Sequence, residues 1–284
     1  MNIDKITLYR KIEKTLHKVP NSNHISEIVC KNFCHILLVD AKYIHVKGYD
    51  KGTAFIYCID YYSHDILINL LAPSESYAAY LSFFSKVKAM NYPLEFLVCD
   101  GLEHIIEACR YYYPNTKIQL CLNHIKEGIR RILKVRSDGT HKAFFTRLAF
   151  AFELKHHLRD YYSYIRKLIR EYSINPIHIS IFSEIVKKDK YLIIHIIFPH
   201  VPATNNLIEA FNSHLEARLK SIRGFQSRES AEIWLNAYVM NRRLSKFTNC
   251  TDKFKYLNGT ISLAHTAMYD APKIFLLKKV NVKD

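Results

Sequence analysis

Short apolar runs and turn residues alternate over the first third of the chain. The segments 36–46, 53–60 and 66–71 are mainly apolar, and residues such as Gly48 and Gly52 separate them. Runs of this length between turns predict strands joined as hairpins. Such hairpins would form the antiparallel half of a mixed sheet.

Helical and strand patterns alternate in the next part of the chain. We expect a helix from about Ser74 to Asn91, then a strand that ends at Asp100. A helix over 103–113 and a strand over 117–121 come next. A strand, a helix and a second strand of these lengths form a parallel crossover unit. Ligands of such sheets gather at the carboxyl ends of the strands, where Asp100 lies.

From residue 122 to about 190 the apolar residues recur at helical spacing. Sustained helices interrupt the alternation of strands and helices, so we interpret this part as an all-α insertion. The apolar segment 191–198 fits a strand or a helix, and periodicity does not separate the two.

The segment 202–225 is predicted to be a turn followed by a long amphipathic helix. Asn206 suits the N-cap, and Glu209 falls at the capping-box spacing. Glu209 lies roughly 135° from the centre of the apolar stripe. Two interpretations remain open: a capping acid worth about 1 kcal/mol, or a metal ligand held at a helix start. The stripe is formed by Leu207, Phe211, Leu215, Leu219 and Ile222.

Two aspartates lie in runs that predict buried strands. Asp40 is inside ILLVDA, and Asp100 ends FLVCD. A buried carboxylate is costly unless a partner compensates it. Each could still be a satisfied aspartate at a strand end. Asp60 and Asp65 lie on or near predicted strands without an assigned role, and Asp60 is the substitute candidate if the register is misjudged.

The order of these acids and their surroundings resembles the DDE transposases, specifically the mutator-like group and its bacterial insertion-sequence relatives. The matching pieces are LLVDAKYIHVKG, FLVCDG, CLNH, TNNLIEAFN, and RGF followed by AEIWLNAYVMNRRLSKF, between about residues 35 and 247. The resemblance implies an α/β fold: an RNase H-like mixed sheet flanked by helices and interrupted by an all-α insertion domain.

By this resemblance, Asp40, Asp100 and Glu209 are the catalytic and metal-binding acids. They would hold two Mg²⁺ ions, with Mn²⁺ as a substitute, and Asp40 would bridge both. Such a pair of ions about 4 Å apart activates a water or a 3′-hydroxyl and stabilises the leaving oxygen. We expect the three carboxylates within about 4–7 Å of a common point. The implied activity is DNA strand cleavage and strand transfer at insertion-element ends.

Other motif residues accompany the acids. Asn205 and Asn206 precede Glu209, and the pair Cys121 and His124 matches the CxxH of the resembled group. A structural zinc site needs four ligands, and only two have suitable spacing here. His104, Cys109, His156 and His157 could supply the rest. The preferred interpretation is that Cys121 and His124 pack under the active site or contact the DNA strand.

The formal net charge of +15 indicates a polyanionic partner, most simply DNA. Residues 110–190 hold 17 Lys and Arg against 7 Asp and Glu, and tyrosines lie between them. This mixture suits phosphate contact with stacking, although a charged helical face is often only solvated. We expect a homodimer when two element ends are engaged. The predicted DNA contacts are Lys126, Arg130, Arg131, Arg166, Lys167, Arg170, Arg218 and Arg223.

Seven scattered cysteines without a CxxC pair are typical of a reducing compartment. No secretory signal or membrane span is recognisable, so a cytoplasmic, nucleoid-associated protein is expected. A TLYR sequence, which often closes the DNA-binding module of the resembled family, begins at Thr7. Most of that module therefore has no room in this sequence.

Five segments follow from these patterns. They are a short helical remnant with a linker (1–30), the first part of the core (31–121), the basic all-α insertion (122–200), the C-terminal core helices (201–248) and a tail (249–284). Two alternatives to the transposase core remain: a shortened transposase-derived DNA-binding protein without transposition activity, and an RNase H-like nuclease of another kind.

Overall fold

The computed structural model describes residues 11–12, 14–154 and 157–268. The chain forms two compact units, and each is built from segments that are not contiguous in the sequence. One unit comprises Met1–His35, Ala41–Pro93 and His214–Asp284, and the other comprises Ile36–Asp40 and Leu94–Ser213. Each is considered by itself. The boundaries of these two units differ from those of the five segments predicted from the sequence, and the division into five segments stays a prediction.

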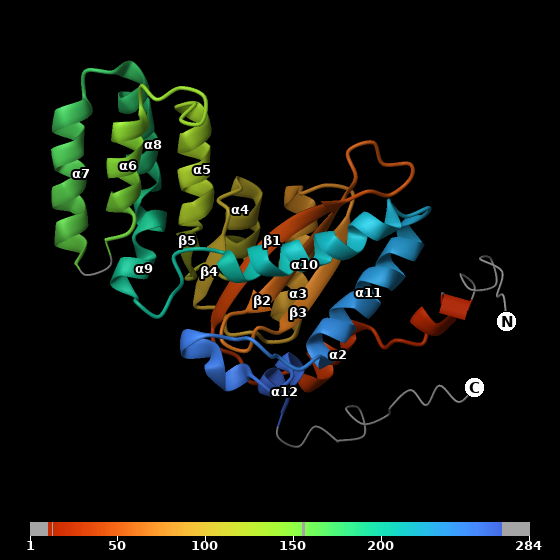
Figure 1. The fold of residues 1–284 in the computed structure, drawn as a ribbon. Helices are drawn as coiled ribbons and strands as arrows, with labels where there is room; N and C mark the ends of the chain where they lie inside the picture. The colour runs from red at the N-terminus through yellow and green to blue at the C-terminus, as the bar shows by residue number, and fades with distance from the viewer. Residues whose placement is uncertain (1–10, 13, 155–156, 269–284) are drawn as a thin grey trace. The chain divides into compact units, whose positions relative to one another are not determined.

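Five strands form one mixed sheet in the order β3-β2-β1-β4-β5. β2 pairs with β3 antiparallel, whereas β4 runs parallel to both β1 and β5. This sheet with its flanking helices confirms the predicted α/β, RNase H-like fold class (Figure 1). The strands are β1 (Ile36–Ile44), β2 (Thr53–Asp60), β3 (Ile66–Ala72), β4 (Phe96–Cys99) and β5 (Lys117–Leu120).

In the first unit, helices cover the β2–β3 hairpin. α3 (Tyr77–Ala89) and α2 (Ser22–Val29) contact β3, as does α11 (Arg228–Leu244). Ser227 caps α11 as expected, and it forms a capping box with Ser230. All eight residues of β2 are buried, so this hairpin lies in the core.

Two parts of this unit differ from the sequence expectation. The segment after Pro20 is not a linker, because α2 begins at Ser22 and Asn21 caps it by accepting a hydrogen bond from the His24 N–H. The segment after Asn249, for which no motif was found, forms η1 (Asp252–Leu257) and α12 (Ser262–Thr266). Both changes add core-forming structure at positions without a long apolar repeat.

A fully buried ion pair joins these added helices to the core. Arg243 on α11 and Asp65 both have side chains that are 0% exposed. The Arg243 Nε and Nη2 atoms donate to the two Asp65 oxygens at 2.9 and 2.8 Å. Arg243 Nη1 donates to the Ser22 carbonyl, and the Ser262 and Thr266 hydroxyls donate to Asp65. A buried charge pair of this kind is tolerated only when its hydrogen bonds are satisfied.

The second unit adds a helical bundle to β4 and β5. α5, α6, α7 and α8 stand side by side (Figure 1, green), and α8 and α9 contact β5. The apolar segment 191–198 is helical, since it forms the end of α8 and all of α9. The helices are α4 (Glu103–Tyr112), α5 (Leu122–Ile132), α6 (Lys142–Ala151), α7 (Leu158–Tyr172), α8 (Pro176–Leu192) and α9 (Ile194–Ile197).

α10 (Asn206–Ile222) is the long helix predicted after Pro202. Gly224 ends the turn that follows it, with φ = 119°, and a Cβ there would lie 2.4 Å from the His45 ring. Only glycine fits this close approach. No helix in the described ranges has the length and apolar character needed to cross a membrane.

Candidate active site

The two predicted aspartates lie shortly after the paired residues of two adjacent parallel strands. β1 and β4 pair in parallel, with Leu37 beside Leu97 and Leu38 beside Val98. Asp40 and Asp100 each lie two residues beyond this last pair, Asp40 inside β1 and Asp100 just after the end of β4. Side chains two residues apart share one face of a strand, and adjacent strands lie about 4.8 Å apart. Both aspartates are half-buried.

The backbone turns sharply just after Asp100. Gly101 has φ = 94°, a conformation that L side chains rarely adopt, and a Cβ there would lie 3.2 Å from the Leu120 side chain. The Asp100 Oδ1 atom accepts a hydrogen bond from the Leu102 N–H at 3.1 Å. Because β4 ends at Cys99 and α4 begins at Glu103, this turn holds the Asp100 carboxylate at the carboxyl end of the strand.

Hydrogen bonds connect the residues just before α10 to β1 and to the start of α5. The Asn205 N–H donates to the Cys121 sulfur at 3.2 Å, and the Asn205 side-chain amide donates to the Val39 carbonyl at 3.4 Å. The Leu122 N–H donates to the Ala203 carbonyl at 3.0 Å. The residue just before α10 therefore lies against the β1 segment that carries Asp40 and against the start of α5.

Glu209 lies on α10 one turn before Asn212. The side-chain amide of Asn212 donates to Asp40 Oδ2 at 3.0 Å. Residues three apart on a helix are neighbours on its surface, so Glu209 lies next to the residue that contacts Asp40. Sequence reasoning missed Asn212, although its spacing from Glu209 was a usable signal.

The predicted cap of α10 shifts by one residue, and the first residue of its apolar stripe changes from Leu207 to Ile208, while Phe211 and Leu215 are buried as predicted. The helix begins at Asn206, and the Glu209 N–H donates to the Asn205 carbonyl. Asn205 thus holds the N-cap position, and Glu209 falls one residue beyond the capping-box place. The buried residues are Ile208, Phe211 and Leu215 instead of a stripe that begins at Leu207. At 100° per residue, Glu209 lies about 127° from the centre of these three residues, close to the predicted 135°.

Asn205 has an unsatisfied atom beside the site. Its side chain is 0% exposed, and its Oδ1 atom has no hydrogen-bond partner in the described part of the chain. Leaving a buried acceptor unpaired costs about 1–3 kcal/mol. This unpaired amide oxygen, close to the β1 segment that carries Asp40, is a hydrogen-bond acceptor and an oxygen ligand of the kind that hard cations prefer.

Cys121 and His124 lie at the start of α5. Cys121 is fully buried, whereas His124 is exposed. The hydrogen bond with Cys121, opposed by burial and assisted by the negative charges of Asp40 and Asp100, raises the pKa of His124 to about 9. His124 borders two cavities. One, of about 660 Å³, is also lined by Asp100, and the other, of about 510 Å³, by Glu209.

The donor set suits a hard divalent cation. Mg²⁺ takes carboxylate and amide oxygens together with water, and Asp40, Asp100 and Glu209 supply carboxylates. Within the ranges that the structure describes, no three His, Cys, Asp or Glu side chains are grouped so that they could hold a metal ion. The convergence of the three acids therefore stays a prediction. Nor does any such group of three in these ranges include Cys121 and His124, so a zinc site there has no support from the described residues. His156, one of the further zinc ligands considered, lies outside the described residues.

The other strand aspartates have structural partners. Asp60 accepts hydrogen bonds from the Cys34 N–H, the Ser63 hydroxyl and the Tyr92 hydroxyl. Asp65 pairs with Arg243. Both carboxylates are buried and compensated by protein groups; Asp60 ends β2, and Asp65 directly precedes β3.

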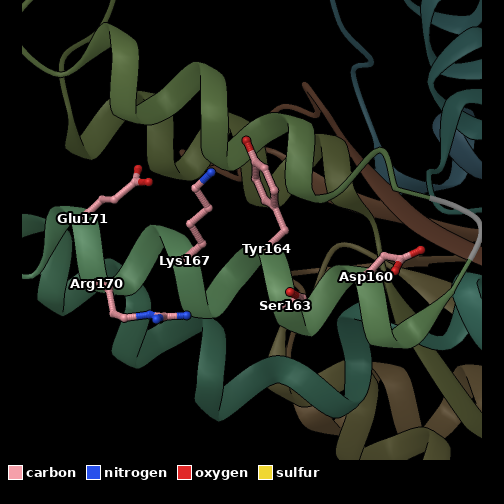
Figure 2. Close-up of a pocket in the computed structure, with 6 residues that line it drawn as sticks. All are labelled: Asp160, Ser163, Tyr164, Lys167, Arg170 and Glu171. Carbon is pink, nitrogen blue, oxygen red and sulfur yellow. The ribbon is translucent and has the colours of Figure 1, made fainter.

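The predicted DNA-binding cations of α7 lie on two sides of that helix. Figure 2 shows Tyr164, Lys167 and Glu171 pointing to one side of α7, while Arg170 points away from them. These residues line a surface hollow of about 600 Å³. Arg166 is four residues before Arg170, so the two arginines share the other face. Arg166, Lys167 and Arg170 are all exposed.

The remaining predicted contacts lie on α5 and near the end of α10. On α5, Lys126 pairs with Glu153, and Arg130 and Arg131 pair with Glu127. The side chains of Arg218 and Arg223 are exposed. DNA contact by any of these residues stays a prediction.

Comparisons with known proteins give one family match. The sequence matches the family described as "Transposase, Mutator family" over residues 28–247. A search of curated proteins gave no significant match. Among solved structures, the catalytic core domain of HTLV-2 integrase in complex with magnesium (trimeric form) aligns with 11% sequence identity and a TM-score of 0.27. The alignment covers 55% of this chain and 85% of that one. Since the family match extends over most of the sequence, the chain belongs to the Mutator family of transposases.

Proposed function

We propose that this chain is a transposase core that cleaves DNA strands and transfers them at insertion-element ends with divalent metal ions. The observation that supports this most strongly is the parallel β1–β4 register, which would bring Asp40 and Asp100 to equivalent positions if it continued two residues beyond the Leu38–Val98 pair. The Asn212–Asp40 hydrogen bond connects the α10 turn carrying Glu209 to the same place.

In this proposal, Asp40, Asp100 and Glu209 hold Mg²⁺ or Mn²⁺ through carboxylate oxygens. The metal, when bound, supplies Lewis-acid activation of the attacking and leaving oxygens of a phosphodiester. The chain's own residues prepare the site. Asn212 orients the Asp40 carboxylate by donating to its Oδ2 atom. The turn at Gly101 orients Asp100. The three carboxylates must draw together when the ion binds.

Other residues position the DNA. His124 borders the cavities of both Asp100 and Glu209, so it is placed to contact a strand that passes between those acids. Asn205, buried with its Oδ1 atom unpaired, would accept a hydrogen bond from a water of the metal's shell. Transfer of two element ends would require two copies of the chain, which is the basis for proposing a homodimer on DNA.

The test has a binding arm and a reaction arm. Calorimetric titration of the protein with Mn²⁺ alone should give saturable binding that Asp40→Asn and Asp100→Asn abolish. Incubation of supercoiled plasmid and a labelled 3′-ended duplex with Mg²⁺ should give nicking and joined product. We expect Asp40→Asn, Asp100→Asn and Glu209→Gln each to lower the rate at least 100-fold, because each removes a charged metal ligand.

The matched control is Glu232→Gln, which also neutralises one carboxylate on a long helix. Glu232 pairs with Arg228, and both side chains are largely exposed. This variant should keep both metal binding and activity. Equal loss in the control, or full activity in Asp40→Asn, would refute the assignment. Nicking without any joined product would instead favour the nuclease alternative.

A further inference from the structure

The cavity beside Glu209 has a strongly charged lining. It has a volume of about 510 Å³, within the range of small-ligand pockets, about 300–1,000 Å³. Glu209 and His124 line it together with residues of α5 and α6. Three of its lining residues are cations: Lys126, Arg130 and Arg131. A hollow with this lining, next to a candidate catalytic acid, suits the phosphates of a nucleic acid strand.

Acidic side chains already engage these cations. Glu127 is the centre of the cluster: its carboxylate lies 2.5 Å from Arg130 Nη1, 3.6 Å from Arg131 Nε and 3.2 Å from Arg136 Nη2. Lys126 Nζ lies 3.6 Å from the Glu153 carboxylate. Burial opposes the ionisation of Glu127, but the Arg130 hydrogen bond and the three arginine charges together lower its pKa.

The geometry is that of an anion surrounded by arginines. The Glu127 side chain is 24% exposed, whereas those of Arg131 and Arg136 are 78% and 77% exposed. Arg130 is held from its other side, since its guanidinium lies 5.0 Å from the centre of the Phe145 ring. Arginine forks bind carboxylate and phosphate in the same way. The carboxylate thus occupies the place that a phosphate group would take among the same arginines.

A purely structural role accounts poorly for this arrangement. Ion pairs between exposed side chains contribute little to stability. One carboxylate shared among three arginines also leaves unused hydrogen-bonding capacity, because each guanidinium has five N–H donors. That capacity is what a phosphate would use.

We propose that this cavity is a phosphate-binding site for the DNA strand, and that Glu127 occupies its arginines in the free protein as a phosphate mimic. Strand entry would exchange the Glu127 carboxylate for a backbone phosphate on Arg130 and Arg131, next to Glu209. This inference rests on the proposed function, since it requires DNA as the ligand. It deepens that function by naming the residues that hold the strand and the side chain that opposes it.

The test is DNA affinity of the full chain in the absence of metal. Binding of a fluorescent 30-base-pair duplex is measured by anisotropy between 50 and 300 mM NaCl, for wild type and for Glu127→Gln. The exchange predicts that Glu127→Gln binds at least about threefold tighter at 100 mM NaCl. It also predicts a steeper salt dependence, by up to about 0.9 in the log–log slope for each additional phosphate neutralised.

Two further variants separate this effect from net charge. Glu232→Gln makes the same charge change at an exposed acid of α11 that pairs with Arg228, and should alter affinity less than Glu127→Gln. In an Arg130→Gln/Arg131→Gln background, adding Glu127→Gln should give no gain. Glu127→Ala, which retains helix propensity, repeats the measurement if the Gln variant folds poorly.

Each outcome bears on the proposal. An equal gain in Glu232→Gln, a gain that persists without Arg130 and Arg131, or unchanged affinity of Glu127→Gln would overturn the phosphate-mimic role while leaving DNA binding intact. If neither the wild type nor any variant binds the duplex, the proposed function fails, and this inference fails with it.

Discussion

The buried ion pair between Arg243 and Asp65 gives the sharpest stability prediction. Replacing Arg243 by Met keeps a long apolar side chain but removes every donor to Asp65 from α11. Asp65 would keep the Ser262 and Thr266 hydroxyls, at 3.0 and 2.6 Å, and the more distant Cys30 thiol, at 4.0 Å. The carboxylate would remain 0% exposed without the cation that compensates its charge.

The expected cost is large for one side chain. Breaking a buried pair by removing one partner costs about 3–5 kcal/mol, because the other charge stays buried. The change also deprives Ser22, Ser26 and Cys30 of their partner on Arg243. Domain stability is about 5–15 kcal/mol, so Arg243→Met would remove about a fifth or more of it. With a urea slope of about 3 kcal/mol/M, the midpoint should fall by roughly 1–1.7 M.

Urea unfolding followed by fluorescence measures this directly. The single tryptophan, Trp234, lies on α11 with Arg243 and reports on the same unit. Arg242→Met is the control: its guanidinium lies 5.0 Å from the centre of the Phe247 ring, a contact worth about 0.5–1 kcal/mol. In the double variant Arg243→Met/Asp65→Asn, the destabilisation should be smaller than the sum of the two single effects by about 1–3 kcal/mol. A destabilisation below about 1 kcal/mol in Arg243→Met, or strict additivity, would refute the reasoning.

Three other predictions follow from the described residues. Ser227→Ala removes the α11 cap and should cost about 1 kcal/mol in the same urea assay; no measurable change would contradict the capping role. Burial first, then the charges of Arg242 and His265, lower the pKa of His64 to about 4. Between pH 6.5 and 4 the unfolded state therefore binds more protons than the folded state, and the free energy of unfolding should decrease as the pH falls through this range. His64→Asn should flatten that pH dependence, and an unchanged profile would contradict this role. Replacing Arg166, Lys167 and Arg170 by Gln should reduce the salt slope of DNA binding by about 0.9 for each phosphate that these side chains neutralise; an unchanged slope would mean that they are only solvated.

Strand positions could be predicted well, since apolar runs and turn residues determine them locally. β2 is Thr53–Asp60 as expected, and the buried strand predicted to end at Asp100 ends one residue earlier, at Cys99. The face of α10 was less predictable, because Leu207 and Ile208 are both apolar and adjacent. Packing against the sheet, which no local pattern encodes, buries Ile208 fully and leaves Leu207 partly exposed.

Long-range polar contacts could not be predicted. Asp65 and Arg243 lie 178 positions apart, and their pairing depends on Ser262 and Thr266 of a segment that carries no recognisable motif. The position of Asn212 next to Glu209 on one helix could be predicted from their spacing. Its hydrogen bond to Asp40 could not, because the two residues meet only in the folded chain. The ion pairs of Glu127 were not anticipated, since charge counts along the sequence record an excess of cations without their partners.

The central claim is that Asp40, Asp100 and Glu209 form one metal site, and diffraction from crystals soaked in Mn²⁺ tests it most directly. Anomalous maps should show Mn²⁺ peaks about 2.0–2.2 Å from carboxylate oxygens of Asp40 and Asp100, with Glu209 in the same coordination shell. Crystals of Asp40→Asn should lack at least one of these peaks. Saturating Mn²⁺ that gives no peak at these aspartates, or a peak held by other residues alone, would contradict the account.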